Sequence, residues 1–376
     1  MITQEGEPQH IQALNLETAV AISEAESVHV NLQYDLVCAN PSTETPVTLV
    51  MGNYNNGEKI EAALDSILSQ RGCKFRLVIL DNHSTDGSWE IIQTYQAKHP
   101  CIEIERLPFN TGPFTWGETL FRAPVGGYMM PCSGNDVLIN NNLVASLACY
   151  LDANQGVCLA YGQSDEPNKQ QEYTFSVPEP NRRPIYVGGD ASMCHDLTTW
   201  LYNYSESLWG MYRTNTIKLI SIPASYGSDH VIVSALSCLG GISGVRQVVR
   251  QVSSNADRGL DGLRNSQIKR QFSAEQTVLT PLEHTNFLML CYSYFQGIRD
   301  SHLPGIDRDG LIARTMAILQ QRFSARMKEE ALIYSNLFMK LRALALSRND
   351  KQYLHRLDAE DSFTRLYLDK IFLGLF

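Results

Sequence analysis

The sequence lacks the features that would place it in several common functional classes. Its 376 residues contain 31 Lys and Arg against 40 Asp and Glu, a formal net charge of −9, with no long basic run. A nucleic acid or an anionic membrane is therefore disfavoured as the main partner. No apolar stretch reaches the roughly 20 residues of a membrane-spanning helix. The start, MITQEGEPQH, lacks a secretory signal pattern. We expect a cytoplasmic protein and leave peripheral membrane contact open.

Cysteine pairs at metal-binding or redox spacing are also missing. The nine cysteines are an odd number, and no Cys-x-x-Cys motif occurs. A disulfide framework and a zinc site are therefore disfavoured. Most of the cysteines lie in apolar segments, where a free thiol packs as a small hydrophobic group. We expect reduced thiols.

The residue pattern divides the chain into three regions. Residues 1–45 are acidic, contain a helical pattern at Ile11–Glu26 and end in a turn-rich linker. Residues 46–255 alternate apolar runs with segments of helical periodicity, which predicts an α/β domain with a mainly parallel sheet. Residues 256–376 have helical periodicity and predict a helical region that packs on the α/β domain or pairs subunits into a homo-oligomer.

The individual elements follow from the same periodicities. The expected strands are VTLVM, FRLVIL, CIEIERL, GGYMMPC, GVCLAYG and GVRQVVRQV. The expected helices are GEKIEAALDSILSQ, the segment from Ser88, TWGETLFRA, NNLVASLACYLDA, the segment after Tyr226, Gln276–Arg299, Leu311–Ser347 and Tyr353–Leu375. Residues 163–190 are polar and rich in proline, and we expect them to be a loop over the sheet edge.

A carboxylate stands at the end of one predicted strand. VILD ends on Asp81 and continues into the polar turn NHSTDG before a helix. Ligands of open α/β sheets bind at the carboxyl ends of parallel strands, which favours a binding role for Asp81. The alternative is a helix cap supplied by Ser84, Thr85 or Asp86. Capping explains the turn well and Asp81 poorly.

Four segments resemble a known family. VTLVMGNYNNGEKIEAALDSILSQ, VILDNHSTDGS, NTG and GGYMMPCSGNDVLINNNLV, in this order and spacing, resemble the first half of the family 2 glycosyltransferases. The resemblance is close over about residues 46–160 and looser to about 250. It implies the A-type glycosyltransferase fold, which is Rossmann-like. It also implies an inverting transfer from a nucleotide sugar, UDP-linked, to a hydroxyl of a glycan, a lipid-linked molecule or a small molecule.

The resemblance also assigns residues around the nucleotide base. The backbone at Gly52 and the ring of Tyr54 would border the base, and Asp81 would accept a hydrogen bond from a base N–H. The alternative for Tyr54 is an aromatic side chain at the edge of the core.

The metal motif of the family falls on Ser133, Gly134, Asn135 and Asp136. The resemblance implies that this segment binds the ribose and, through Mg²⁺ or Mn²⁺, the diphosphate. A serine and an asparagine replace two of the usual acids, so Asp136 is the only anionic ligand and Asn135 a neutral one. The alternative for Asp136 is a turn residue ahead of the helix at Asn141.

The acceptor side is implied by two further residues. Asp229, at the start of a predicted helix, matches the general base that takes the acceptor proton, with a helix cap as the alternative. Trp209 would stack on an acceptor sugar, or else be a core aromatic. The neighbouring His230 is expected to be a packing or surface side chain.

Two other functions stay open. A catalytically silent nucleotide-sugar-binding or scaffold module is supported by the altered metal motif. It is also supported by Trp116, Gly117 and Glu118, which stand where the family has Ala-Arg-Asn. A nucleotidyltransferase is disfavoured, because no glycine-rich loop with a lysine follows the first strand.

Overall fold

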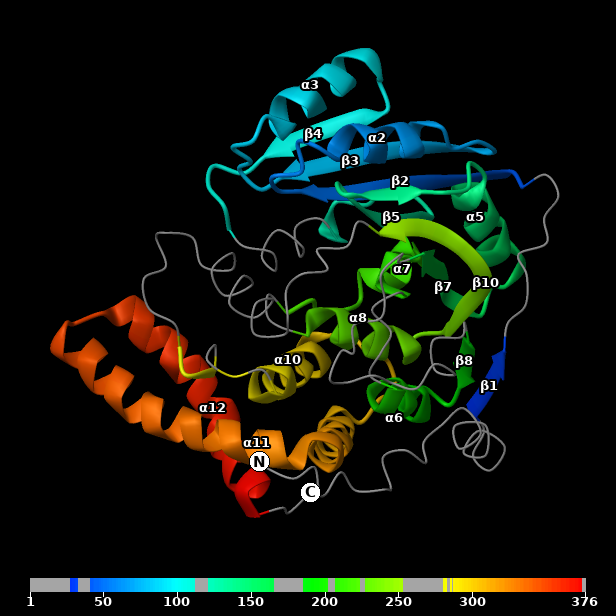
Figure 1. The fold of residues 1–376 in the computed structure, drawn as a ribbon. Helices are drawn as coiled ribbons and strands as arrows, with labels where there is room; N and C mark the ends of the chain where they lie inside the picture. The colour runs from blue at the N-terminus through cyan, green and yellow to red at the C-terminus, as the bar shows by residue number, and fades with distance from the viewer. Residues whose placement is uncertain are drawn as a thin grey trace, which may run out of the picture.

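One large mixed sheet organises the protein (Figure 1). The computed structural model describes residues 28–32, 41–111, 121–165, 185–201, 207–223, 227–252, 280–282, 285 and 287–373. Within these residues the sheet has ten strands in the order β1-β8-β10-β7-β9-β5-β2-β3-β4, with β6 paired to β10. The strands are β1 (Val28–Leu32), β2 (Thr43–Asn53), β3 (Cys73–Asp81), β4 (Ile102–Arg106), β5 (Tyr128–Ser133), β6 (Asp136–Leu138), β7 (Val157–Asp165), β8 (Ile185–Gly189), β9 (Met211–Arg213) and β10 (Gly241–Val252).

Most strands run in one direction. The pairs β2–β3, β2–β5, β3–β4 and β7–β10 are parallel. The strands β6, β8 and β9 are antiparallel to their neighbours. The expected α/β fold with a mostly parallel sheet is therefore confirmed, and the carboxyl ends of β2, β3 and β5 lie together at one edge.

Helices cover both faces of the sheet. They are α2 (Ile60–Leu68), α3 (Ser88–Lys98), α5 (Leu143–Ala153), α6 (Ala191–Leu201), α7 (Thr214–Ile217), α8 (Ser228–Ser237), α10 (Phe287–Asp300), α11 (Arg308–Ser347) and α12 (Lys351–Leu373), with the 3-10 turn η2 (Ser207–Trp209). Along β2, Leu49 and Met51 pack with α2 and α5, whereas Val50 joins the core on the other face with α8. This alternation is the period of two that a strand buried on both faces requires. Among the described helices, none combines the length and apolar character needed to span a bilayer.

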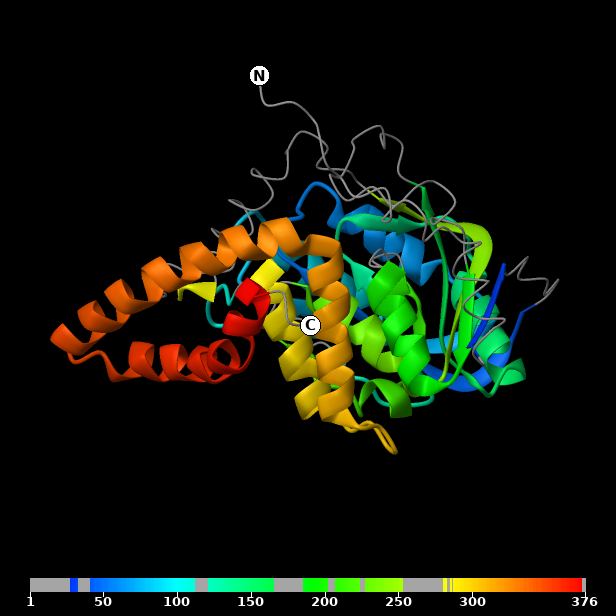
Figure 2. The same ribbon diagram turned by 90° about the horizontal axis from the view of Figure 1, so that it is seen from below.

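The helical C-terminal region packs on the α/β domain. Val231 of α8 lies in one hydrophobic cluster with side chains of α10, α11 and α12. Arg314 of α11 forms an ion pair with Asp196 of α6 at 2.8 Å. Helix α11 is kinked at Phe323, and beyond this residue α11 and α12 form a hairpin that projects from the body (Figures 1 and 2).

Several elements differ from the sequence-based expectation. The expected loop at 163–190 begins inside β7 and ends in β8, and α6 follows it. The strand β1 lies in the region expected to be an extension and linker, and pairs with β8. Helix α10 begins at Phe287 rather than at Gln276. The predicted helix Ile11–Glu26 and most of TWGETLFRA lie outside the described residues.

Candidate active site

The predicted donor-site residues meet at the carboxyl ends of three neighbouring strands. In the sheet register Asn53 of β2 pairs with Asp81 of β3, and Gly52 of β2 pairs with Ser133 of β5. Residues from three separate segments therefore form one edge. This is where an open parallel sheet binds its ligands.

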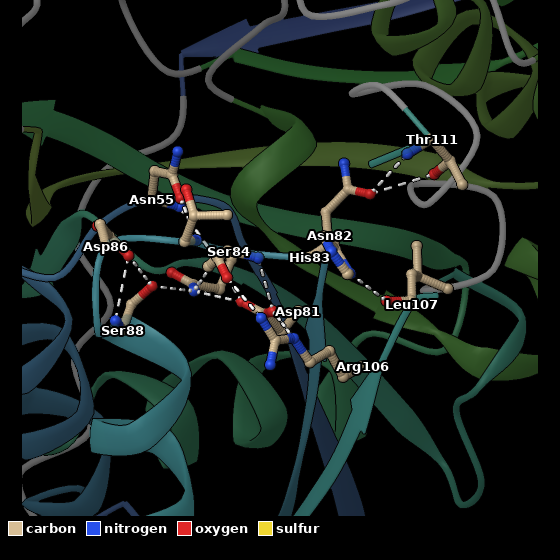
Figure 3. Close-up of polar contacts among 12 residues, drawn as sticks. Asn55, Asp81, Asn82, His83, Ser84, Asp86, Ser88, Arg106, Leu107 and Thr111 are labelled. Atoms are coloured by element: carbon tan, nitrogen blue, oxygen red, sulfur yellow. Dashed lines mark hydrogen bonds and ion pairs between the residues drawn. The ribbon is translucent and has the colours of Figure 1, made fainter. Parts of the chain in front are cut away.

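Asp81 is fully buried at this edge (Figure 3). Its Oδ1 accepts hydrogen bonds from Asn53 Nδ2 at 2.8 Å and Ser84 Oγ at 2.5 Å. Its Oδ2 accepts one from the Ser84 backbone N–H at 2.9 Å and lies 3.4 Å from Arg106 Nε. Asp81 therefore joins β2, the turn after β3 and β4. The predicted contact with a base N–H is not supported by this geometry, because the side chain is 0% exposed and both oxygens already have donors.

The turn after Asp81 is held in an uncommon backbone conformation. His83 has φ +60° and Asn55 has φ +51°, both in the left-handed region where asparagine and histidine are enriched among non-glycine residues. Asn55 Oδ1 accepts a hydrogen bond from the Thr85 N–H at 2.9 Å, and Ser84 Oγ accepts one from the Asn55 N–H at 3.0 Å. The two turns, after β2 and after β3, therefore hold each other in place.

Asp86 prepares the start of α3. Its Oδ1 accepts hydrogen bonds from Ser88 N–H at 3.1 Å and Ser88 Oγ at 2.6 Å, and its Oδ2 accepts one from Gly57 N–H at 2.7 Å. Partial burial raises the pKa of Asp86, but these hydrogen bonds outweigh it and hold the pKa below its usual value. The N-cap of α3 is Gly87, so none of Ser84, Thr85 and Asp86 is the cap residue, and Asp86 instead braces the first turn from the position before the cap.

The adjacent Asn82 points to the other side of the chain (Figure 3). Its Nδ2 donates to Asn110 Oδ1 at 3.0 Å, and its Oδ1 accepts from the Thr111 N–H at 2.9 Å. Successive side chains on a strand alternate in direction, which is why the carboxylate and the amide diverge. The sequence reasoning missed Asn53, Asn82 and Arg106. The alternation after Asp81 was the available signal for Asn82.

The segment after β5 is fixed against β2. The Gly134 N–H donates to the Gly52 carbonyl at 3.3 Å. A Cβ on Gly134 would lie 2.7 Å from Asn53 Oδ1, so this position requires glycine or movement of a buried amide. Ser133 Oγ donates to Asn135 Oδ1, which orients the Asn135 amide.

Asp136 occupies a strand and not a turn before a helix. It is the first residue of β6, pairs with Val252 of β10, and is 7% exposed. The alternative of a turn residue ahead of the helix is therefore wrong, and the N-cap of α5 is Asn142.

The donor set at Asn135 and Asp136 limits how a cation could bind. Across the described part of the chain, no group of three His, Cys, Asp or Glu side chains is placed to hold a metal. Mg²⁺ is commonly bound through one or two protein carboxylates together with substrate phosphates. One carboxylate and one amide oxygen therefore fit an ion that arrives with a diphosphate, but not one that the protein alone retains.

Asp229 lies in the first turn of α8. The N-cap is Gly227 at φ +82°, and no side chain caps this helix. The Asp229 side chain is 33% exposed, and its Oδ2 lies 3.8 Å from His230 Nε2. Asp229 is thus a partly exposed carboxylate beside an imidazole. The alternative, that Asp229 is the cap residue of this helix, is wrong, because Gly227 is the N-cap.

The aromatic residues near α8 differ in burial. Trp209 in η2 is half-buried, as is Tyr54 after β2, so neither is a full core residue. Helix α8 packs against η2, which places Trp209 and Asp229 on neighbouring elements. Tyr212 of β9 is fully buried, and burial together with the nearby Cys158 and Asp229 raises its pKa well above the usual value. Tyr212 therefore stays protonated.

Comparisons with known proteins give a family match for part of the chain and similar folds for most of it. Residues 48–182 match the sequence model of the family described as Glycosyl transferase family 2. The structure is similar to S. aureus TarS 1-349 in complex with UDP-GlcNAc, with a TM-score of 0.52 and 14% identity over 85% of this chain and 92% of that chain. A mannosyltransferase from Pyrobaculum calidifontis in complex with GDP-Man and Mn²⁺ gives a TM-score of 0.46 at 16% identity, over 88% and 90% of the two chains.

The similarity to TarS supports the fold and nothing beyond it. The comparison with curated protein sequences found no match. The family match covers the three strand ends at which Gly52, Asp81 and Ser133 lie. Residues 48–182 therefore carry a glycosyltransferase family 2 segment, and the chain has the A-type glycosyltransferase fold.

Proposed function

We propose that this protein transfers a sugar from a UDP-sugar donor to a hydroxyl group of a glycan, a lipid-linked molecule or a small-molecule acceptor, with inversion at the anomeric carbon. The observation that carries the proposal is the edge formed by the carboxyl ends of β2, β3 and β5 inside the family-matched segment. The similar S. aureus structure is a complex with UDP-GlcNAc, which favours a uridine nucleotide as the first donor to test.

On the donor side, the half-buried Tyr54 and the backbone at Gly52 border the base. Asn82, next to Asp81, is also buried, and its amide bonds to Asn110 and Thr111, so it holds the segment at 110–111 beside the strand ends. Ser133 contacts the ribose through its hydroxyl group in this proposal. This arrangement leaves Asp81 as the residue that orients the turn.

The diphosphate lies against Asn135 and Asp136 in this proposal. Mg²⁺ or Mn²⁺, when bound there with the donor, would neutralise the negative charge that develops on the leaving nucleoside diphosphate. Asp136 supplies the only carboxylate of the motif from the start of β6. Asn135 supplies an amide oxygen that the Ser133 hydroxyl already orients.

On the acceptor side, Asp229 acts as the general base. The acceptor oxygen attacks the anomeric carbon from the face opposite the phosphate, and a new C–O bond forms. The bond between the anomeric carbon and the phosphate oxygen breaks, the nucleoside diphosphate leaves with the electron pair, and Asp229 takes the hydroxyl proton. A partly exposed carboxylate in a first helical turn suits this task, because an acceptor hydroxyl can reach it. The half-buried Trp209 offers a flat apolar face to the acceptor sugar.

The variant Asp229→Asn tests the proposal. It should lower transfer by about 10²–10⁴-fold, because the amide cannot accept the proton. Donor binding, measured as the rise in unfolding temperature with a UDP-sugar and Mn²⁺, should scarcely change. Asp307→Asn is the matched control, because Asp307 is a true N-cap whose side chain accepts from Gly310 N–H at 3.1 Å. Asparagine caps about as well as aspartate, so the control should keep full transfer. Unimpaired transfer by Asp229→Asn would exclude Asp229 as the base.

The second candidate function is a catalytically silent nucleotide-sugar-binding module. The single carboxylate of the segment 133–136 favours it. A silent module would bind UDP-sugars but show neither transfer nor slow donor hydrolysis with any divalent ion. Measurable donor hydrolysis that Asp136→Asn abolishes would exclude it.

A further inference from the structure

The projecting half of α11 has two apolar faces. The face toward the protein includes Met327, Ala331 and Tyr334, which are buried against α10 and α12. The opposite face carries Leu332, Met339 and Leu346, which are 59%, 70% and 56% exposed. The hairpin of α11 and α12 stands away from the body in both views, so the described elements of this chain leave that face open (Figures 1 and 2).

The exposed residues follow the spacing of a coiled coil. We define the α11 seam as Leu332, Asn336, Met339, Ala343 and Leu346, all of which are exposed. Their steps of four and three residues repeat every seven, with Leu, Met and Leu at one core position and Asn and Ala at the other. A heptad repeat matches a second helix that winds around the first, and a single asparagine in the core row fixes register and the number of helices.

A flat lipid surface fits this face less well than a helix. An interfacial helix needs a broad apolar face, whereas the seam is narrow and has Asn336 at its centre. Glu329 precedes the seam in the same row and is exposed. A partner with the same narrow heptad pattern is the better match.

The flanking charges allow a second copy of this chain to pair in parallel. One flank carries Lys328, Ser335 and Arg342, and the other carries Ile333, Lys340 and Ser347. In a parallel coiled coil each residue of the first flank faces the residue five positions later in the other copy, so Lys328 meets Ile333, Ser335 meets Lys340 and Arg342 meets Ser347. No two cations face each other. In an antiparallel pair the first flank faces itself, which brings Lys328 close to Arg342.

We propose that the α11 seam is a homodimer interface, in which two copies of the chain pair in parallel along residues Leu332–Leu346. The paired length is about 21 Å at 1.5 Å per residue, which is short for a coiled coil. Interfaces of this size belong to weak, reversible complexes. The fraction of dimer should therefore change with protein concentration in the micromolar range. Each copy keeps its own active site in its α/β domain, away from the seam.

Analytical ultracentrifugation of the full chain tests the proposal. Between about 1 and 100 µM, the measured mass should rise from that of one 42.2 kDa chain toward twice that mass. The variant Leu332→Glu/Met339→Glu should keep the mass of one chain throughout. The control Leu344→Glu/Leu366→Glu makes the same chemical change at two exposed apolar residues outside the seam and should dimerise as the parent does. Equal unfolding temperatures for all three proteins would show that folding is intact.

A cysteine near the end of α11, at the tip of the hairpin, tests the direction of pairing. In a parallel dimer Leu346→Cys brings the two new thiols together, so mild oxidation should give a cross-linked species that the parent does not form. A dimer that does not cross-link would overturn the parallel register. A parent that keeps the mass of one chain at the highest concentration would overturn the interface, as would a control that dissociates like the seam variant. Co-flotation of a monomeric parent with phosphatidylglycerol and phosphatidylcholine vesicles would assign the seam to a lipid surface instead.

Discussion

Replacing Asp81 by asparagine should destabilise the protein before any nucleotide is added. The change keeps the side-chain volume and creates no cavity. The Oδ1 side can still accept from Asn53 and Ser84, but an amide NH₂ at the Oδ2 side would face the Ser84 N–H and Arg106, which are also donors. A buried donor left without an acceptor costs about 1–3 kcal/mol. Removing one partner of a buried charge pair costs about 3–5 kcal/mol. Because the Arg106 side chain is 32% exposed and retains water, we expect a total near the lower end, about 3 kcal/mol.

Urea unfolding followed by circular dichroism measures this cost directly. Asp65→Asn is the matched control, because Asp65 is exposed and its side chain accepts a single hydrogen bond among the described residues, from the Tyr95 hydroxyl group at 2.8 Å. It should shift the free energy of unfolding by less than about 1 kcal/mol. A base-reading Asp81 makes the opposite forecast, with unchanged stability and lost donor binding. An Asp81→Asn protein as stable as the parent would therefore refute the structural role derived from its contacts.

Three further predictions follow from other parts of the structure. Asp136→Asn should lower metal-dependent transfer far more than Asn135→Ala, because only Asp136 supplies charge, and full turnover in excess chelator would remove both from a metal role. Burial holds the pKa of His195 below the usual 6.5. The unfolded chain therefore takes up a proton as the pH falls through about 6.5 while the folded chain does not. Stability should drop by up to about 1.4 kcal/mol per pH unit relative to His195→Gln, and equal pH profiles in urea titrations would contradict this. Gly297→Ala should destabilise by about 1–3 kcal/mol, since its Cβ would lie 2.2 Å from Val231 Cγ1, and an unchanged unfolding temperature would show that the two helices separate easily.

The sequence predicted the elements whose side chains repeat regularly. Strand β2, helix α2 and strand β3 were found because their apolar residues follow periods of 2 and 3.6. Strand β8 and helix α6 were missed because a polar, proline-rich stretch precedes them and hides the short apolar run at Ile185. Strand β1 was missed because it is completed only by pairing with β8, more than 150 positions away in the chain. Such pairings leave no local periodicity.

The site shows the same limit at the level of single residues. The place of Asp81 at a strand end was predictable from VILD and the turn that follows. The contacts of its carboxylate with Asn53 and Arg106 were not predictable, because these two residues lie on other strands that reach Asp81 only in the folded sheet. The family pattern could place Asp136 after β5, but its entry into β6 depends on pairing with β10.

Strand β4 is one edge of the sheet, and its composition bears on how the chain avoids misassembly. An uncovered edge strand offers free backbone groups to a second sheet and invites aggregation. Three of the five residues of β4, Glu103, Glu105 and Arg106, are charged and exposed. Extending the sheet across this edge would bury or oppose those charges. The edge is thus protected against uncontrolled growth from one molecule to the next, and replacing Glu103 and Glu105 by threonine would remove that protection without touching the donor site.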